Sequence, residues 1–153
     1  MIRTDKRLRL CRAMIAALLI FIWGNSLMPG WASQSISDWL AGILLGTRSV
    51  GGEMAAGSGV LRKLAHFTEF AALGMCLAWL CGMLGRGKWS PFFRGVLAAV
   101  ADETIQCFVP ERGPGIKDVC IDAAGVLAGI ILLRMGHDYF KKRSAKKQSL
   151  EDK

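Results

Sequence analysis

Eight charged or amide side chains between residues 102 and 122 interrupt two otherwise apolar segments. A charged side chain at the centre of a bilayer costs about 2.5 to 3.5 kcal/mol on insertion scales, so such groups normally face one another or a polar cavity. The segment therefore predicts a carboxylate-rich site buried between transmembrane helices. Its polar residues are Asp102, Glu103, Gln106, Glu111, Arg112, Lys117, Asp118 and Asp122.

A second group of ionisable residues lies at helical spacing on an earlier apolar segment. Lys63, His66 and Glu69 follow one another at intervals of three residues, so His66 and Glu69 would be neighbours on one helix face. The pair could act as a base with its orienting carboxylate, or as two ligands of a divalent cation. The plainer alternative places Lys63 among lipid headgroups and leaves His66 hydrogen-bonded to water. Because there is no complete metal signature, we predict no metal site, and the cofactor is unknown.

Two adjacent carboxylates give the strongest signal. Asp102 and Glu103 lie deep in an apolar segment, and Gln106 shares a helix face with either one. Adjacent helical side chains point about 100° apart. We therefore expect Glu103 to face the site with Gln106, and Asp102 to pair elsewhere. The alternative is a structural ion pair with Lys63 or Arg112.

The last apolar segment adds further carboxylates. Asp118 and Asp122 are four residues apart and share one helix face. Arg112, in the preceding turn, is the natural cation for this cluster, or for a phosphate or carboxylate of a ligand. Gly125 and Gly129 follow as a GxxxG pattern, which predicts close packing against another helix.

Carboxylates from three segments share one depth. With a rise of 1.5 Å per residue, Glu69, Asp102, Glu103 and Asp122 all lie about 8 to 10 Å from the same end of the predicted bundle. Chance placement would scatter them. The sequence therefore predicts one site at that end.

The composition indicates a membrane protein. The 153-residue chain is 52% hydrophobic, with a mean hydropathy of +0.34, which is high for a soluble domain. We predict an all-α fold, a four-span transmembrane helical bundle of residues 1–136, with spans at about 10–28, 66–84, 91–109 and 116–135. Residues 137–153 would form a basic cytoplasmic tail. A cleaved signal peptide is the alternative for the first span, although that run is long and no A-x-A site follows.

The connection between the first two spans carries the pattern of a short interfacial helix. Ser37 or Asp38 is the expected N-cap. Residues 39, 40, 43 and 44 then form an apolar face, with Trp39 at the level of the lipid headgroups. Residues 46–59 contain five glycines, which predicts a flexible loop.

The five cysteines contain no CxxC pair and are odd in number. Free thiols that pack as small apolar side chains are therefore expected. A disulfide between Cys107 and Cys120 is the alternative.

The placement of basic residues predicts the orientation in the membrane. Lys and Arg number 20, against 12 Asp and Glu, but they cluster beside apolar runs, so no nucleic acid partner is expected. With four spans, fifteen basic residues lie on the side of the two termini and five on the other side. Because basic residues mark the cytoplasmic side, both termini are expected in the cytoplasm and the polar site faces outward.

Three stretches together resemble the VanZ-like family of membrane proteins. They are Arg62-Lys63-Leu64-Ala65-His66-Phe67-Thr68-Glu69-Phe70, Asp102-Glu103-x-x-Gln106-x-Phe108-Val109-Pro110-x-Arg112, and Asp118-Val119-x-x-Asp122-x-x-Gly125-x-x-x-Gly129. The family often has Gly in place of Glu111 and Asn in place of Asp122. The resemblance implies a multi-span bacterial envelope protein, and its founding member is associated with low-level teicoplanin resistance.

Three functions remain open from the sequence. The first is an integral protein of the bacterial inner membrane that binds or shields an envelope lipid or a lipoglycopeptide. The second is a membrane enzyme acting on an envelope amphiphile, so whether the protein is an enzyme is uncertain. The third is a small transporter or proton relay. The hypothetical catalytic residues are His66, Glu69 and Glu103, and the candidate ligand-binding residues are Lys63, Asp102, Gln106, Arg112, Asp118 and Asp122.

Overall fold

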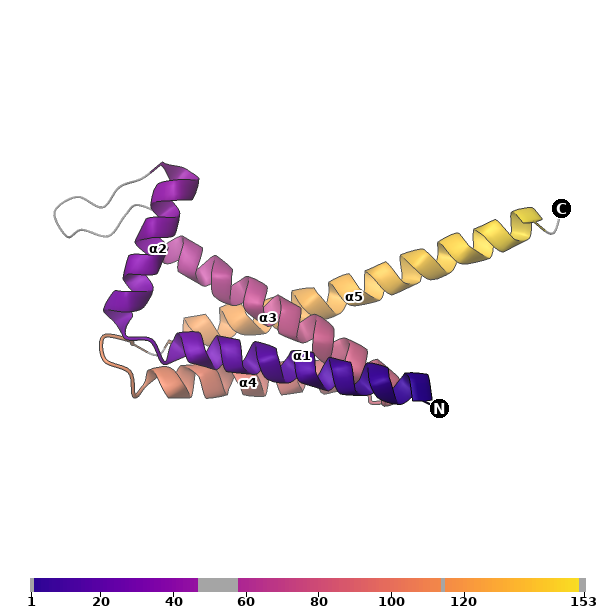
Figure 1. Ribbon diagram of the computed structural model, residues 1–153, viewed down its shortest axis with the longest axis horizontal. Coiled ribbons are helices and arrows are strands. Elements are labelled where there is room, and N and C mark those ends of the chain that lie inside the picture. Colours follow the sequence, from indigo (N-terminus) through magenta and orange to yellow (C-terminus); the bar gives the residue numbers. More distant parts are fainter. Residues whose placement is uncertain (1, 47–57, 114, 152–153) are drawn as a thin grey trace.

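Five helices form the described part of the chain in the computed structural model, which describes residues 2–46, 58–113 and 115–151. They are α1 (Ile2–Ser26), α2 (Gly30–Leu45), α3 (Ser58–Met83), α4 (Ser90–Gln106) and α5 (Ile116–Glu151), and these residues contain no strand. α1, α3, α4 and α5 run in alternating directions, so both termini point away from the end that α2 crosses (Figure 1). The all-α prediction is confirmed.

Two of the helices are long and apolar enough to cross a membrane. They contain the segments Asp5–Ser26 of α1 and Gly59–Met83 of α3. α4 has only 17 residues, and both α4 and α5 carry buried carboxylates. The described residues therefore support two candidate spans, and the four-span bundle stays a prediction.

Several helix boundaries differ from those predicted by hydropathy. α1 begins at Ile2 rather than near residue 10, because Arg and Lys favour a helix nearly as well as Leu does. α3 begins at Ser58 rather than near residue 66, so Lys63 lies on the helix. α4 ends at Gln106, four residues before Pro110. α5 continues to Glu151, so residues 137–151 of the predicted tail are helical.

α2 exists, but its predicted start is wrong. Pro29 is the N-cap, and Ser37 lies buried inside the helix, where its hydroxyl donates to the Ser33 carbonyl at 3.0 Å. A proline next to a helix start is favourable, since its φ is fixed and no N–H is left unpaired. Gly46 ends the helix with φ 66°. The predicted flexible loop lies mostly outside the described residues, while its last two, 58 and 59, belong to α3.

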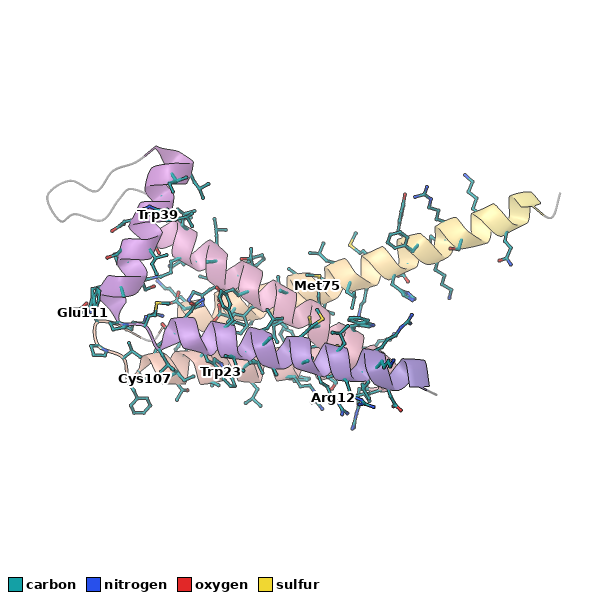
Figure 2. All side chains as sticks on the ribbon, in the orientation of Figure 1. Arg12, Trp23, Trp39, Met75, Cys107 and Glu111 are labelled. Carbon is teal, nitrogen blue, oxygen red and sulfur yellow. The ribbon has the colours of Figure 1, made fainter. Side chains whose placement is uncertain are left out.

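One side of α2 is apolar and exposed. Trp31, Trp39, Ile43 and Leu44 are each at least 60% exposed. Figure 2 shows Trp39 on α2, with Glu111 near the start of this helix. The Gly30 amide donates to the Pro110 carbonyl at 3.2 Å, which holds the α4–α5 loop against the start of α2.

α3 packs against every other helix and forms the centre of the fold. The apolar core contains Phe70, Leu73 and Leu77 of α3 and Val126 and Ile130 of α5. The contact between α3 and α5 depends on glycine. A Cβ atom on Gly125 would lie 3.2 Å from the Phe67 carbonyl carbon, and one on Gly129 would lie 2.8 Å from that of Ala71. The predicted packing role of the GxxxG pattern is confirmed.

The cysteines follow the prediction of free thiols. Cys11, Cys76 and Cys81 are buried, whereas Cys107 and Cys120 are exposed. The alternative disulfide between Cys107 and Cys120 is absent from the described residues.

Candidate functional site

His66, Asp102 and Asp122 meet inside the bundle from three different helices. His66 Nδ1 on α3 lies 3.9 Å from Asp102 Oδ2 on α4 and 3.9 Å from Asp122 Oδ1 on α5. Asp102 is 0% exposed and Asp122 is 1% exposed, whereas 18% of the His66 side chain is exposed. The three side chains can therefore share a proton or a cation, and only His66 reaches the surface.

Gln106 connects both carboxylates of α4. Its Nε2 donates to Asp102 Oδ2 at 2.9 Å, to Glu103 Oε1 at 3.3 Å and to Ser26 Oγ of α1 at 3.4 Å. The expectation that Asp102 would pair away from the site was wrong. Gln106 stands at the end of α4, between the directions of the two carboxylates, so it reaches both of them.

Glu103 also fixes the start of α5. Its Oε2 accepts the Gly115 backbone N–H at 2.9 Å. The Glu103 side chain therefore joins the end of α4 to the loop that leads into α5. It lines the site at the same time.

Glu69 does not pair with His66, although their spacing in the sequence predicts such a pair. Its Oε1 accepts from Asn25 Nδ2 of α1 at 3.3 Å. In the described part of the chain, no hydrogen bond or ion pair joins Glu69 to His66. The carboxylates nearest His66 come from other helices instead, so the predicted base–carboxylate pair within α3 is not formed.

Arg112 reaches α1 from the loop between α4 and α5. Its Nη2 donates to the Asn25 carbonyl at 3.0 Å, and its Nε is buried without a hydrogen-bond partner among the described residues. Burial, together with the nearby Arg62, lowers the pKa of the Arg112 guanidinium. An anionic ligand would relieve both effects.

Two small hollows adjoin these residues. The first, of about 70 Å³, is lined by Arg62, Lys63, His66, Glu103, Gln106, Glu111, Arg112, Gly113, Asp118, Ile121 and Asp122. The second, of about 140 Å³, is lined by Asn25, Met28, Ser33, Ile36, Ser37, Leu40, Leu61, Arg62, Ala65, His66, Glu69 and Arg112. Arg62, His66 and Arg112 border both, so one polar hollow and one more apolar hollow meet at the same three side chains.

Most of the predicted site residues therefore come together. Asp102 lies behind the first hollow and Glu69 faces the second, while the remaining seven line the first. Sequence reasoning missed Arg62 and the serines 33 and 37 of α2. Arg62 precedes Lys63 in the motif and could have been included, whereas the serines lie far from the other polar residues in the sequence.

Several buried oxygens of the site lack partners. Glu69 Oε2, Asp102 Oδ1 and Asp122 Oδ2 form no hydrogen bond within the described residues. A buried polar group without a partner costs about 1 to 3 kcal/mol, and more if it is charged. Such groups in a native fold are explained by a bound water or ion, by a catalytic role or by strain.

The family comparison covers most of the chain. The VanZ/LLP1 family model matches residues 12–137. The chain belongs to the VanZ/LLP1 family. No curated protein and no solved structure matches the chain. Family membership and the two apolar helices support a membrane protein.

The VanZ-like stretches quoted from the sequence supply nearly the whole site. They contain His66, Asp102, Gln106, Arg112 and Asp122. Their glycines hold α5 against α3, so the same stretches provide both the polar groups and the close packing around them.

Glu111 departs from the VanZ-like pattern at a position where the backbone conformation favours glycine. It has φ 61°, the left-handed region that favours glycine. The family often has Gly at this position. The turn therefore keeps a glycine conformation with a glutamate in it.

Proposed function

We propose that this VanZ/LLP1 protein crosses the bacterial cytoplasmic membrane four times and binds or shields an envelope amphiphile at an outward-facing polar site. The alternating directions of α1, α3, α4 and α5 support four crossings (Figure 1). The excess of basic residues toward the two termini supports cytoplasmic termini. The site then opens at the extracytoplasmic end, beside α2.

The exposed apolar side of α2 supports a position of this helix at the outer surface of the membrane. Tryptophans are enriched at the boundary between lipid and water, and Trp31 and Trp39 would lie there. Ser33, Ser37 and Leu40 of the same helix line the second hollow. A ligand that enters from the outer leaflet would therefore reach the site along α2.

The observation that carries the proposal is the half-buried Arg112 at the border of the two hollows, whose Nε is buried without a partner among the described residues. A guanidinium with a free donor recognises phosphate or carboxylate groups. The polar hollow suits a headgroup, and the second hollow, with Met28, Ile36 and Leu40, suits an adjoining acyl chain. An anionic lipid or a lipoglycopeptide such as teicoplanin combines both parts.

A membrane enzyme acting on the same class of ligand is the second candidate. His66 between two carboxylates favours it, because an imidazole placed in this way can transfer protons. His66 or Glu69 would be the base, with Glu103 and Asp122 as acids. The first hollow offers no Ser, Thr or Cys among its described lining residues, so water would have to be the nucleophile. An enzyme would lose turnover in Glu103→Gln while still binding its ligand.

A transporter or proton relay is less well supported. The half of the bundle away from α2 is filled by apolar side chains, among them Leu73, Leu77 and Ile130. A path for a polar solute would need partners there. Binding without transfer across the membrane is therefore the simpler proposal.

Teicoplanin susceptibility tests the proposal in cells. Bacteria would express the wild type, Glu69→Gln, Arg112→Gln or the exposed-tail control Lys142→Gln, at matched membrane levels. We expect protection by the wild type and by the control, and loss of protection in the two site variants. Equal protection by all four proteins would contradict a role of the polar site in resistance. No protection by the wild type would exclude a lipoglycopeptide as the ligand.

A further inference from the structure

The side chains of His66, Asp102 and Asp122 have the geometry of a metal-ligand set. Each offers one ligand atom, and the three atoms lie within 4.8 Å of one another. His66 Nδ1 lies 3.9 Å from an oxygen of each carboxylate. An ion between three such atoms would lie about 2.3 to 2.5 Å from each of them, slightly beyond the 2.0 to 2.2 Å of zinc–ligand bonds. Small side-chain rotations would close the remaining difference.

Unpartnered oxygens independently point to a ligand at this place. Asp102 Oδ1 and Asp122 Oδ2 are buried and accept no hydrogen bond in the described residues, and both side chains are almost fully inaccessible. Neither carboxylate has a Lys or Arg within ion-pair distance in that part of the chain. Two buried carboxylates beside each other repel, and a divalent cation would neutralise both. The unpartnered atoms are the second oxygens of these carboxylates, because Asp102 Oδ2 and Asp122 Oδ1 are the ones 3.9 Å from His66 Nδ1. Bidentate binding or a small side-chain rotation would bring them to the ion.

The surroundings resemble those of a metal site with open positions. Gln106 orients Asp102 by a hydrogen bond of 2.9 Å, as outer-shell residues do for ligating carboxylates. His66 and Asp122 also line the first hollow, which lies beside Arg112. A bound ion would therefore have protein ligands on one side and water or an anionic group on the other.

We propose that His66, Asp102 and Asp122 bind one divalent metal ion of the Mn²⁺ or Zn²⁺ class. One imidazole and two carboxylates suit these borderline ions better than Ca²⁺, which prefers oxygen ligands alone, or Cu⁺, which prefers sulfur. The ion is held between α3, α4 and α5. The proposal concerns the metal alone and stands whether or not a lipoglycopeptide is the ligand.

Mn²⁺ titration of the full-length protein in detergent, followed by electron paramagnetic resonance, tests this site. Mn²⁺ avoids the exposed thiols of Cys107 and Cys120, because it prefers oxygen and nitrogen ligands. We expect one Mn²⁺ per chain, displaced by Zn²⁺. His66→Gln and Asp102→Asn should each weaken binding at least about tenfold.

Two matched controls carry the same substitutions at exposed positions of α5. His137→Gln and Asp138→Asn change side chains that are 78% and 73% exposed, and both should bind Mn²⁺ like the wild type. The proposal would be overturned if His66→Gln and Asp102→Asn bind Mn²⁺ as well as the wild type does, or if the wild type binds none. The three side chains would then share a proton instead of a metal ion.

A measurement on the wild type alone covers the case in which the site variants fail to fold. Pulsed electron paramagnetic resonance of the Mn²⁺ complex should detect coupling to the nitrogen of one imidazole. A bound Mn²⁺ without nitrogen coupling would overturn the assignment of His66.

Discussion

Replacing Gly129 with alanine should separate α3 from α5. A Cβ atom there would lie 2.8 Å from the Ala71 carbonyl carbon and 3.0 Å from the Met75 nitrogen, well inside the usual contact distance of about 3.5 to 4.0 Å. All these neighbours are backbone atoms of a helix, so they cannot rotate away. The helices would have to move apart by about 1 Å.

The expected cost follows from two opposing effects. Overpacking a close interface costs about 1 to 3 kcal/mol, and backbone neighbours place this case at the upper end. Alanine favours the helix over glycine by about 0.8 to 1.0 kcal/mol. Gly129→Ala should therefore lower the free energy of unfolding by about 1 to 2 kcal/mol. Gly136→Ala, on the same helix with nothing within 4 Å of its Cβ, should leave it unchanged or raise it by up to about 1 kcal/mol.

Reversible unfolding of the purified protein in mixed micelles, followed by circular dichroism as the SDS fraction rises, measures this difference. We expect Gly129→Ala to unfold at a lower SDS fraction than both the wild type and Gly136→Ala. If the two variants unfold together, close backbone packing between α3 and α5 does not stabilise the fold and the reasoning fails.

Three further variants test the loop and the residues that hold it, with the same unfolding assay. Glu111→Gly should raise the free energy of unfolding by about 0.5 to 1 kcal/mol, because it removes a left-handed conformation that costs a side chain about 1 to 2 kcal/mol; a loss would contradict the strain. Glu103→Ala should lower it by about 1 to 3 kcal/mol, since the half-buried Gly115 N–H loses its acceptor, whereas Glu103→Gln keeps an oxygen and should lie near the wild type. Arg112→Ala should lower the free energy of unfolding by at most about 2 kcal/mol, because removal of the unpaired Nε partly offsets the lost bond to the Asn25 carbonyl. The main effect of this substitution should be weaker teicoplanin binding by the purified protein. A larger loss of stability would make Arg112 chiefly structural.

The sequence predicted the helices well because hydropathy and helical spacing report directly on buried faces. It misplaced their ends, since charged residues such as those of residues 3–12 continue a helix beyond its apolar part. The start of α2 was assigned to Ser37 or Asp38 from capping preference alone. Pro29 decided it instead, and in the fold Gly30 also contacts the α4–α5 loop, a constraint that no local pattern contains.

The site was predictable in part for a similar reason. Equal depth of carboxylates on three segments predicted that they meet. Asp102 and Asp122 both lie beside His66, whereas Glu69 pairs with Asn25 of α1. Partner choice was not predictable, because it depends on how the helices are rotated about their axes. The rotation of α3 points His66 toward α4 and α5, whereas Glu69 reaches Asn25 of α1.

Labelling of a single cysteine from outside the cell tests most directly whether the polar site opens to the extracytoplasmic side. Gly113 is exposed, lines the first hollow, and has nothing within 4 Å of its Cβ position, so Gly113→Cys is a suitable reporter in a chain whose native cysteines are replaced by alanine. Lys142→Cys, on the exposed far part of α5, is the matched control. We predict that a membrane-impermeant maleimide labels Gly113→Cys in intact spheroplasts and labels Lys142→Cys only after permeabilisation. The opposite pattern, or labelling of both from outside, would contradict it.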